Sequence, residues 1–389
     1  MTLTDKPVVD RQDNYPMKYW SRRKIDFQLL KIFNYNWILI TILINFCLFT
    51  AIIALSNKQN STGTAIMALS TNEGQRMFTD EQRERIIKEV YAKYPSYYPN
   101  FDKVHLMYAS SLWIPTERYY LTVLRVYQFP FSSVLYVTTH SEDGWKERAD
   151  KFKIGSFCGP GILPIPIDMT VNRCKGPEDP RIYRNEQDDI CISFNMHSND
   201  RRRIYMYNLN DGKLTKFDSP ILPTDQLQKN WAPIKIADKI FYLYSYDPLR
   251  LMDCTEPNNC TIVNDGSIQP IGPLRTASPF TEVVKGIYFG FVFYHAEGEH
   301  YRPFLSVLEV DSGIPNSIRQ IYLSEVLEFK NSSFTDPKIL IACSIARVDL
   351  DRNFMDVTVF FEDKECCAYR LSGVKEFLQL AREESIIKK

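Results

Sequence analysis

The first strong feature of the hydrophobic pattern is an uncharged segment over 37–55, in which Asn45 is the one strongly polar residue. As a helix it would be roughly 28 Å long at about 1.5 Å per residue, close to the thickness of the hydrocarbon core of a bilayer. A buried core helix is one alternative, but an uncharged stretch of this length near a terminus favours a transmembrane helix. A cleaved signal peptide is the other alternative, although its apolar region is usually about 7–15 residues long and begins nearer the N-terminus.

The charges around this segment predict its orientation. Residues 56–74 hold a single lysine. The basic residues that precede the segment are Lys18, Arg22, Arg23, Lys24 and Lys31. The positive-inside rule therefore places the N-terminus in the cytosol. We expect a cytosolic tail over 1–36, a transmembrane signal anchor over 37–55, a stem over 56–78 and a lumenal catalytic domain over 79–389, in the Golgi or another secretory-pathway membrane.

After the anchor the pattern changes to one helix followed by many short β runs. Thr79–Gln82 forms a capping box, and apolar residues at helical spacing follow it, which predicts a helix of about four turns. From Val104 onward, runs of apolar and aromatic residues alternate with turn sequences such as Asn210–Gly212. A second helix is expected over Val374–Ile387.

The number and spacing of these strands predict an all-β domain with flanking helices. About five groups of four strands would form a five-bladed β-propeller, and a large sandwich is the alternative. The sequence contains no glycine-rich phosphate loop, so the doubly wound folds usual for nucleotide-sugar transferases are not supported.

Charge and cysteine content narrow the class of protein. The chain has 47 basic and 47 acidic side chains, which gives no electrostatic reason to expect nucleic acid as a partner. Eight of the nine cysteines follow the anchor, where disulfides persist. Cys254 and Cys260 are candidates for a local bridge, and Cys158 and Cys174 form a second candidate pair. No CxxC pair occurs with a histidine, so we expect no zinc or other metal site.

Three acceptor sequons for N-glycosylation agree with a lumenal domain. They begin at Asn60, Asn259 and Asn331. Each could arise by chance, so together they support the predicted topology without establishing it.

The densest group of chemically capable residues is the run Lys175–Ile182, which reads KGPEDPRI. Pro180 pushes Asp179 toward an extended conformation, and alternation along a strand then puts Asp179 and Arg181 on one face and Glu178 on the other. A carboxylate could move a proton, and a guanidinium could hold a phosphate or a sugar oxygen. A surface salt bridge beside a turn is the alternative interpretation.

Two further clusters combine a cation with a proline just before a strand. One contains Lys229 and Asn230, and the other contains Arg275; the strand after the second cluster ends in Tyr294 and His295. Equivalent edges of successive propeller blades meet at the central channel, so these side chains could surround one site together with Asp179.

Other residues near these clusters have both a functional and a structural interpretation. Trp231 could stack on a sugar or a base, or it could belong to the core of a blade. His197, which follows Asn195 of the SFN strand, could line the site, or it could be a polar loop residue. The triplet Asp349–Asp351 matches a metal-binding DxD pattern, but a polar hairpin explains it better. The basic run Arg201–Arg203 could attract an anionic glycan, although a solvated loop explains it better.

The segments GPEDPRI, SFN, KNWAP and LRTASPF with YFGFVFYH together resemble the fungal β-mannosyltransferases that add β-1,2-mannose to yeast cell-wall mannan. The resemblance runs over about residues 100–370. The EDPR core is also similar to that of the β-mannoside phosphorylases and related protozoan mannosyltransferases, which are five-bladed propellers. This resemblance implies that Asp179 is the catalytic acid or base, and that Arg181, Lys229 and His295 hold phosphate. The sequence around Arg275 departs from the glycine-rich counterpart in the phosphorylases.

The resemblance implies a reaction with GDP-mannose as donor and a mannan or other mannose-containing glycan as acceptor. Asp179 would act as the base in an inverting displacement, with donor contacts from Arg181, Asn195, Lys229, Asn230, Arg275, Tyr294 and His295. Arginine and lysine could stabilise the departing GDP without a metal. The alternatives are a β-mannoside phosphorylase or hydrolase and a non-catalytic glycan-binding propeller.

Overall fold

The computed structural model describes residues 70–71, 74–96, 103–128, 132–168, 170, 175–198, 201–221, 229–265, 274–294 and 300–387. Within these ranges no helix is both long enough and apolar enough to cross a membrane. The predicted cytosolic tail over 1–36 and the predicted anchor over 37–55 lie outside the described residues.

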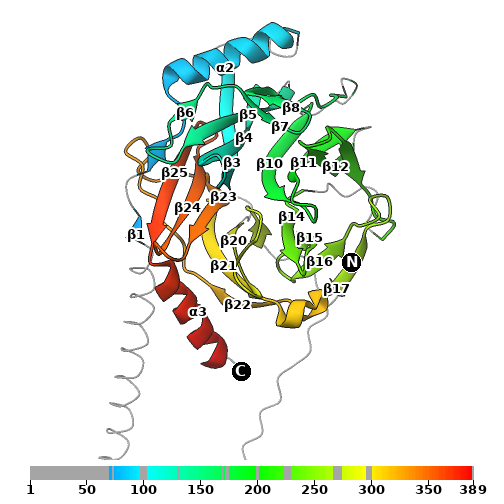
Figure 1. The fold of residues 1–389 in the computed structure, drawn as a ribbon, viewed down its shortest axis with the longest axis vertical. Helices are drawn as coiled ribbons and strands as arrows, with labels where there is room; N and C mark the ends of the chain where they lie inside the picture. Colours follow the sequence, from blue (N-terminus) through cyan, green and yellow to red (C-terminus); the bar gives the residue numbers. More distant parts are fainter. Residues whose placement is uncertain are drawn as a thin grey trace, which may run out of the picture. The chain divides into compact units, whose positions relative to one another are not determined.

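Most strands belong to five antiparallel sheets (Figure 1). The first consists of β3 (Val104–Ile114), β4 (Tyr119–Gln128), β5 (Ser132–Ser141), β6 (Glu147–Arg148) and β9 (Gly161–Ile162). The second consists of β10 (Pro177–Arg184), β11 (Ile190–Ser198), β12 (Arg201–Asn208) and β13 (Leu214–Phe217). The third consists of β14 (Ala232–Ile236), β15 (Lys239–Ser245), β16 (Arg250–Asp253) and β17 (Thr261–Asp265).

The fourth sheet consists of β18 (Leu274–Thr276), β19 (Thr281–Val284), β20 (Ile287–Tyr294), β21 (Arg302–Glu309) and β22 (Arg319–Leu323). The fifth consists of β23 (Leu340–Asp349), β24 (Phe354–Phe361) and β25 (Glu365–Ser372), joined by β1 (Ser70–Thr71) and β2 (Gln75–Arg76). A separate two-stranded sheet contains β7 (Phe152–Ile154) and β8 (Phe157–Gly159). The predicted five-bladed β-propeller is therefore confirmed, with the blades arranged around a centre as Figure 1 shows.

The ring closes through the last blade. β1 and β2 come from the N-terminal side of the described chain, and both pair with β25, the third strand of the C-terminal blade. Parallel bridges connect neighbouring sheets, as between Ser132 and Lys175 and between Ile234 and Phe280. These contacts bring the innermost strands β3, β10, β14, β18 and β23 around the central channel.

Two helices accompany the propeller, as the sequence predicts. α2 (Asp80–Lys93) begins with a capping box in which Thr79 and Gln82 bond each other's backbone N–H groups, and it buries Ile86, Ile87 and Val90. α3 (Val374–Ile387) buries Phe377 against Phe289 of the fourth blade and Tyr322 next to it. Short 3-10 helices at Asp311–Gly313 and Pro315–Ser317 precede β22.

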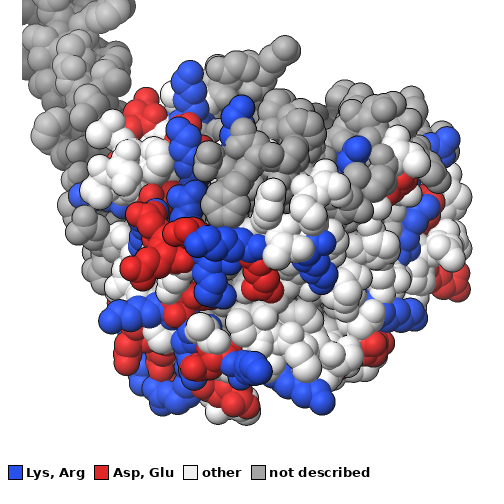
Figure 2. All heavy atoms as spheres, turned by 90° about the horizontal axis from the view of Figure 1, so that it is seen from above, with Lys and Arg blue, Asp and Glu red and all other residues white. Residues whose placement is uncertain are grey.

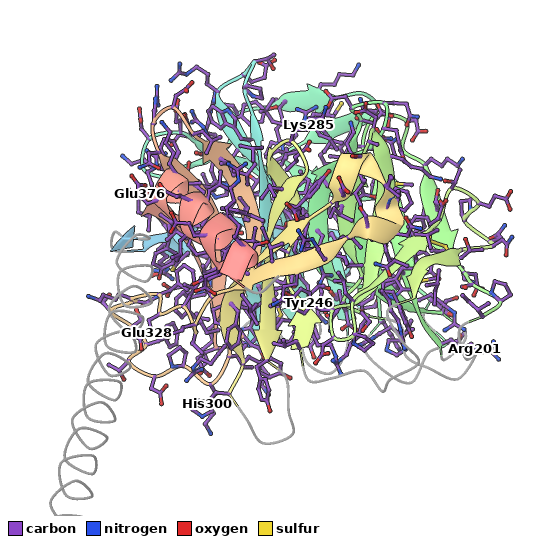
Figure 3. All side chains as sticks on the ribbon, turned by 90° about the horizontal axis from the view of Figure 1, so that it is seen from below. Arg201, Tyr246, Lys285, His300, Glu328 and Glu376 are labelled. Carbon is purple, nitrogen blue, oxygen red and sulfur yellow. A yellow bond between two sulfur atoms is a disulfide. The ribbon has the colours of Figure 1, made fainter. Side chains whose placement is uncertain are left out.

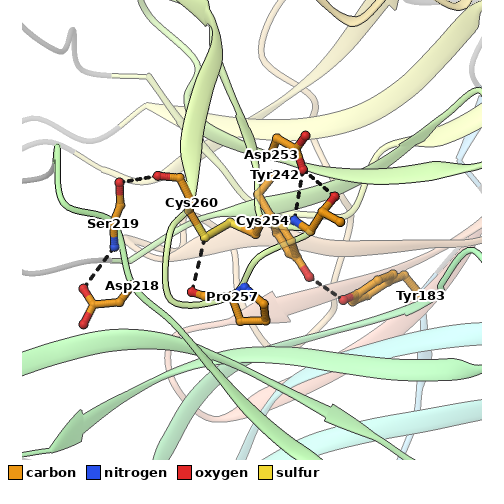
Figure 4. Close-up of a disulfide and its surroundings, with 9 residues drawn as sticks. Tyr183, Asp218, Ser219, Tyr242, Asp253, Cys254, Pro257 and Cys260 are labelled. Carbon is orange, nitrogen blue, oxygen red and sulfur yellow. Dashed lines mark hydrogen bonds between the residues drawn. A yellow bond between two sulfur atoms is a disulfide. The ribbon is translucent and has the colours of Figure 1, made fainter.

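One of the two predicted cysteine pairs forms a disulfide. Cys254 and Cys260 are bonded across the β16–β17 hairpin (Figure 4). Cys158 is an exposed free thiol, whereas Cys174, its predicted partner, lies outside the described residues. The other free cysteines that the structure describes are buried.

Charged side chains are mixed on the surface. The face in Figure 2 shows basic and acidic groups interspersed over its described part, without a broad area of one sign. This distribution agrees with the equal numbers of acidic and basic residues in the sequence.

His140 is a completely buried histidine whose environment requires the neutral ring. Nε2 donates to the carbonyl of Met77 at 3.1 Å, and Nδ1 accepts from the hydroxyl of Thr122 at 2.9 Å. Burial lowers the pKa of His140 to about 4, while the hydrogen bond to Met77 opposes this shift.

This shift predicts a loss of stability in mild acid. Between pH 6.5 and pH 4 the unfolded state binds a proton that the folded state excludes, so the free energy of unfolding falls as the pH falls. We expect a decrease of about 2 kcal/mol between pH 7.5 and pH 5 from this residue. Urea denaturation of the wild type and of His140→Gln at both pH values measures it; an equal pH dependence in the two proteins would contradict the assignment.

Candidate active site

The candidate site is a cavity of about 640 Å³ at the mouth of the channel where the innermost strands begin. Its wall includes residues from the start of β3, β10 and β23, the ends of β4 and β24, and the segment before β14. A second cavity, of about 1430 Å³, lies at the opposite mouth and includes Ile182 and Lys285. Figure 3 shows these two ends of the ring, with Lys285 at one edge and His300 and Arg201 at the other.

Asp179 lines the first cavity from a β-bulge in β10. The register between β10 and β11 shifts between Glu178 and Arg181, and Asp179 has a left-handed backbone with φ of 53°. Such a conformation costs an L-residue roughly 1–2 kcal/mol and is concentrated at functional sites. The side chain of Asp179 is 23% exposed, so its carboxylate remains accessible from the cavity.

Two neighbours hold this carboxylate in place. Asn195 on β11 donates from Nδ2 to Asp179 Oδ2 at 3.2 Å and to the carbonyl of Glu178 at 3.3 Å. Arg125 on β4 places Nη1 3.7 Å from Asp179 Oδ1. Asn195 is almost completely buried. It therefore positions Asp179 and does not make the contact with the donor that the sequence predicts.

Glu178 lines the same cavity, and the expectation that it would point away from Asp179 is wrong. The bulge interrupts the alternation on which that expectation depends, so two successive carboxylates reach one cavity. Glu178 receives two hydrogen bonds from Arg202, at 3.0 and 2.8 Å, and lies 3.6 Å from Arg125. Its charge is therefore compensated by two guanidinium groups.

The basic run Arg201–Arg203 begins strand β12, so the expectation of a solvated loop is also wrong. Arg202 lies inside the site, where its Nε donates to His197 Nε2 at 3.2 Å. His197 is buried behind Arg202 and orients it, because the ring nitrogen that faces Arg202 accepts this bond.

Arg181 does not line the cavity, contrary to its predicted role as a phosphate ligand. Its side chain is buried in the channel, and it donates to the carbonyls of Ala277 at 3.0 Å, Thr276 at 3.1 Å and Asp179 at 3.2 Å. A further bond of 3.4 Å joins it to the hydroxyl of Tyr108. These bonds occupy the guanidinium and connect three blades, so Arg181 has a structural role.

Lys229 and Asn230 lie on the cavity wall, as predicted. Lys229 forms no hydrogen bond or ion pair within the described part of the chain, and it is exposed on the rim. Partial desolvation lowers the pKa of Lys229, and the charges of Arg202 and Arg275 lower it further, while Asp179 and Glu178 raise it. This lysine therefore keeps its ammonium group available to a ligand that also approaches Asp179.

The remaining predicted residues have other positions. Arg275 is close enough to influence Lys229 but is not part of the cavity wall, and Tyr294 ends β20 beside it without lining the cavity. His295 lies outside the described residues.

Trp231 is almost completely buried and contacts Tyr242 and Tyr244, so it belongs to the core of a blade. Asp349 accepts hydrogen bonds from Arg347 and from the backbone of Arg352, consistent with a polar hairpin.

Arg125 and Asp363 also line the cavity, although no motif of the sequence points to them, and so does Arg202, which the sequence places in a solvated loop. Arg125 could have been found, because it is the one charged residue in the buried run of β4. A charge that is retained in such a run requires a partner of opposite sign.

The sequence is similar to that of a known glycan-active enzyme over part of its length. No protein-family model matches the chain. The chain is 25% identical over 209 residues to β-mannosyltransferase 3 of Komagataella phaffii; the match covers 46% of this chain and 35% of that protein. The chain thus matches only about a third of the length of this curated relative. The resemblance to β-mannosyltransferases is confirmed by this match.

Solved structures with a similar fold include β-1,2-mannobiose phosphorylase from Listeria innocua in complex with β-1,2-mannobiose. It is 10% identical with a TM-score of 0.48, and the alignment covers 72% of this chain and 92% of that one. A mannose phosphorylase from Leishmania mexicana in complex with a phosphate ion is 12% identical with a TM-score of 0.42, covering 77% and 96%. The propeller is established here by the strand pairing, independently of these two similarities.

Proposed function

We propose that this protein is an inverting β-mannosyltransferase that moves mannose from GDP-mannose to a mannan or related glycan, forming β-1,2 linkages in cell-wall glycan synthesis. The observation that carries the proposal is the presence of the accessible carboxylate of Asp179 and the available ammonium of Lys229 in one cavity. The curated relative, a β-mannosyltransferase, supports the choice of mannose.

The chemistry of the site fits one displacement at the anomeric carbon. Mannose in GDP-mannose has an α linkage, so a single attack by an acceptor hydroxyl gives a β-mannoside. Asp179 accepts the proton of this hydroxyl, directly or through a sugar hydroxyl. Lys229 lies where it can stabilise the negative charge that develops on the departing GDP.

The neighbouring residues keep Asp179 ready for this role. Arg125 lies within 4 Å of both carboxylates, at 3.7 Å from Asp179 and 3.6 Å from Glu178, and Arg202 compensates Glu178. Asn195 fixes the orientation of the group from the buried side.

The test is transfer by the full-length protein in detergent, with GDP-mannose and α-mannobiose as substrates. We expect a trisaccharide whose new linkage is β-1,2 by NMR. An α-linked product would contradict the proposal. Release of mannose 1-phosphate from a β-mannoside, strictly dependent on phosphate and without transfer from GDP-mannose, would instead identify a phosphorylase.

We also propose that the site faces the lumen of the Golgi or another secretory compartment, with the chain anchored through 37–55. The described sequons then differ in their ability to carry a glycan. Asn259 is exposed on the β16–β17 hairpin, where its amide makes one hydrogen bond, to Glu256 at 3.4 Å. Asn331 uses both hydrogens of Nδ2, bonding Glu365 at 3.1 Å and Cys367 Sγ at 3.3 Å.

We therefore expect a glycan at Asn259 and little occupancy at Asn331, because a glycan replaces one hydrogen of Nδ2. Peptide mass spectrometry after glycosidase treatment measures both occupancies, with Asn259→Gln as the control for the assignment. Full occupancy at Asn331, or none at Asn259, would contradict this expectation.

A further inference from the structure

The β24–β25 hairpin brings another carboxyl group to the candidate active site. Its two central residues, Glu362 and Asp363, both have left-handed backbones, with φ of 50° and 53°. The N–H of Lys364 donates to the carbonyl of Phe361 at 2.9 Å and closes the turn. Turns with two left-handed residues favour Asn-Gly or Asp-Gly. Glu-Asp at these positions therefore makes the turn less stable than a pair that contains glycine.

Glu362 fixes the hairpin against the neighbouring strand. Its carboxylate accepts the backbone N–H groups of Lys338 and Ile339, and its own N–H donates to the carbonyl of Ile339 at 3.0 Å. These bonds explain why Glu362 occupies the turn. Asp363, the other central residue, lies on the cavity wall and takes no part in these bonds.

Asp363 is an exposed residue of the cavity wall, open to a ligand that enters the cavity. It makes no hydrogen bond or ion pair of its own within the described residues, but it lies in electrostatic range of Arg125, Asp179 and Tyr301, all of which line the cavity. Desolvation raises the pKa of Asp363, and the charges of Asp179 and Glu362 raise it further, while Arg125 lowers it. A carboxyl group in this position gains a partner when a polar ligand enters.

We infer that Asp363 is a second substrate-contacting carboxyl group, which binds a hydroxyl of the acceptor sugar next to the hydroxyl that Asp179 deprotonates. The inference rests on the proposed function. A carboxylate repels the diphosphate of the donor, which is attracted to Lys229, and it therefore suits the uncharged acceptor. Asp179 and Asp363 line the same cavity of about 640 Å³, so a sugar bound there can contact both carboxyl groups.

Two substitutions test this inference in the full-length protein. Asp363→Asn keeps the shape of the side chain and removes the charge. Asp363→Gly removes the side chain and suits a left-handed backbone, so this variant keeps the fold even if the asparagine variant does not. The matched controls are Asp238→Asn and Asp238→Gly, because Asp238 is the second left-handed residue of the β14–β15 turn, with φ of 63°, and lines the opposite cavity.

We expect both Asp363 variants to raise the KM for α-mannobiose roughly 10–100-fold, the loss typical of a hydrogen bond to a charged group. The KM for GDP-mannose should stay within about twofold, and the Asp238 variants should match the wild type. An unchanged acceptor KM, an equal rise in both KM values, or the same effect in the Asp238 variants would overturn the inference.

Direct binding separates this inference from the proposed function. Titration of the full-length protein with α-mannobiose alone, followed by calorimetry, requires no transfer. Binding by the wild type that is weakened in Asp363→Gly supports the contact even if no transfer from GDP-mannose occurs. Equal binding by the wild type and Asp363→Gly, or no binding by either, overturns it, whatever the result of the transfer assay.

Discussion

Asp179→Asn lowers the rate of mannosyl transfer by about 10²–10⁴-fold, the usual contribution of a general base. The amide has nearly the shape of the carboxylate, and its oxygen can still accept the bond that Asn195 donates at 3.2 Å. It cannot accept a proton from the acceptor hydroxyl. The loss should therefore appear in kcat, with the KM for GDP-mannose changed much less, because Lys229 remains in place.

The appropriate control is Asp188→Asn, since Asp188 also has a left-handed backbone, with φ of 64°, in the turn that follows the same strand. Asp188 pairs with Arg184 on the exposed surface and is not part of the cavity. The control should transfer mannose at the wild-type rate, and both variants should melt within a few degrees of the wild type. An Asp179→Asn enzyme that retains more than a tenth of the wild-type kcat would exclude Asp179 as the base.

The sequence predicts the propeller well because each blade is built from local contacts. Consecutive strands pair as hairpins, and their apolar runs and turn residues are visible within a short stretch of sequence. The closure of the ring is different. β1 and β2 are only two residues long, lie in the predicted stem, and pair with β25 almost 300 residues later, so no local pattern indicates them.

The candidate site likewise contains some residues that the sequence predicts and others that it does not. Asp179, Lys229 and Asn230 were predicted because proline-containing clusters precede their strands, and the structure brings them to one cavity. The expected orientation of Glu178 is wrong because a single bulge changes which side chains share a face, and Arg181, expected on the face of Asp179, is buried in the channel. The ion pair of Arg125 on β4 with Glu178 on β10 joins two blades, so the folded ring determines it, whereas Arg202 and Glu178 lie in the same blade.

Arg181→Met should lower the free energy of unfolding by about 3 kcal/mol or more, with little specific effect on the KM for GDP-mannose. The guanidinium bonds carbonyls of β10 and of the β18 region and the hydroxyl of Tyr108 on β3, in a position that is 2% exposed. Methionine fills a similar volume but leaves buried acceptors without donors, at roughly 1–3 kcal/mol for each group. Chemical denaturation measures this loss.

Arg181→Lys distinguishes the structural role from the phosphate contact expected from the sequence. Lysine keeps the positive charge but lacks the planar fork that reaches several carbonyls, so a structural role predicts nearly the same loss of stability as methionine. A phosphate contact predicts instead a stable protein with a modest rise in the donor KM.

Lys229→Met is the reciprocal control. Lys229 lies exposed on the rim, so the variant should unfold like the wild type while its KM for GDP-mannose rises at least tenfold. If Arg181→Lys were as stable as the wild type and Lys229→Met bound the donor normally, the roles assigned to these two cations would have to be exchanged.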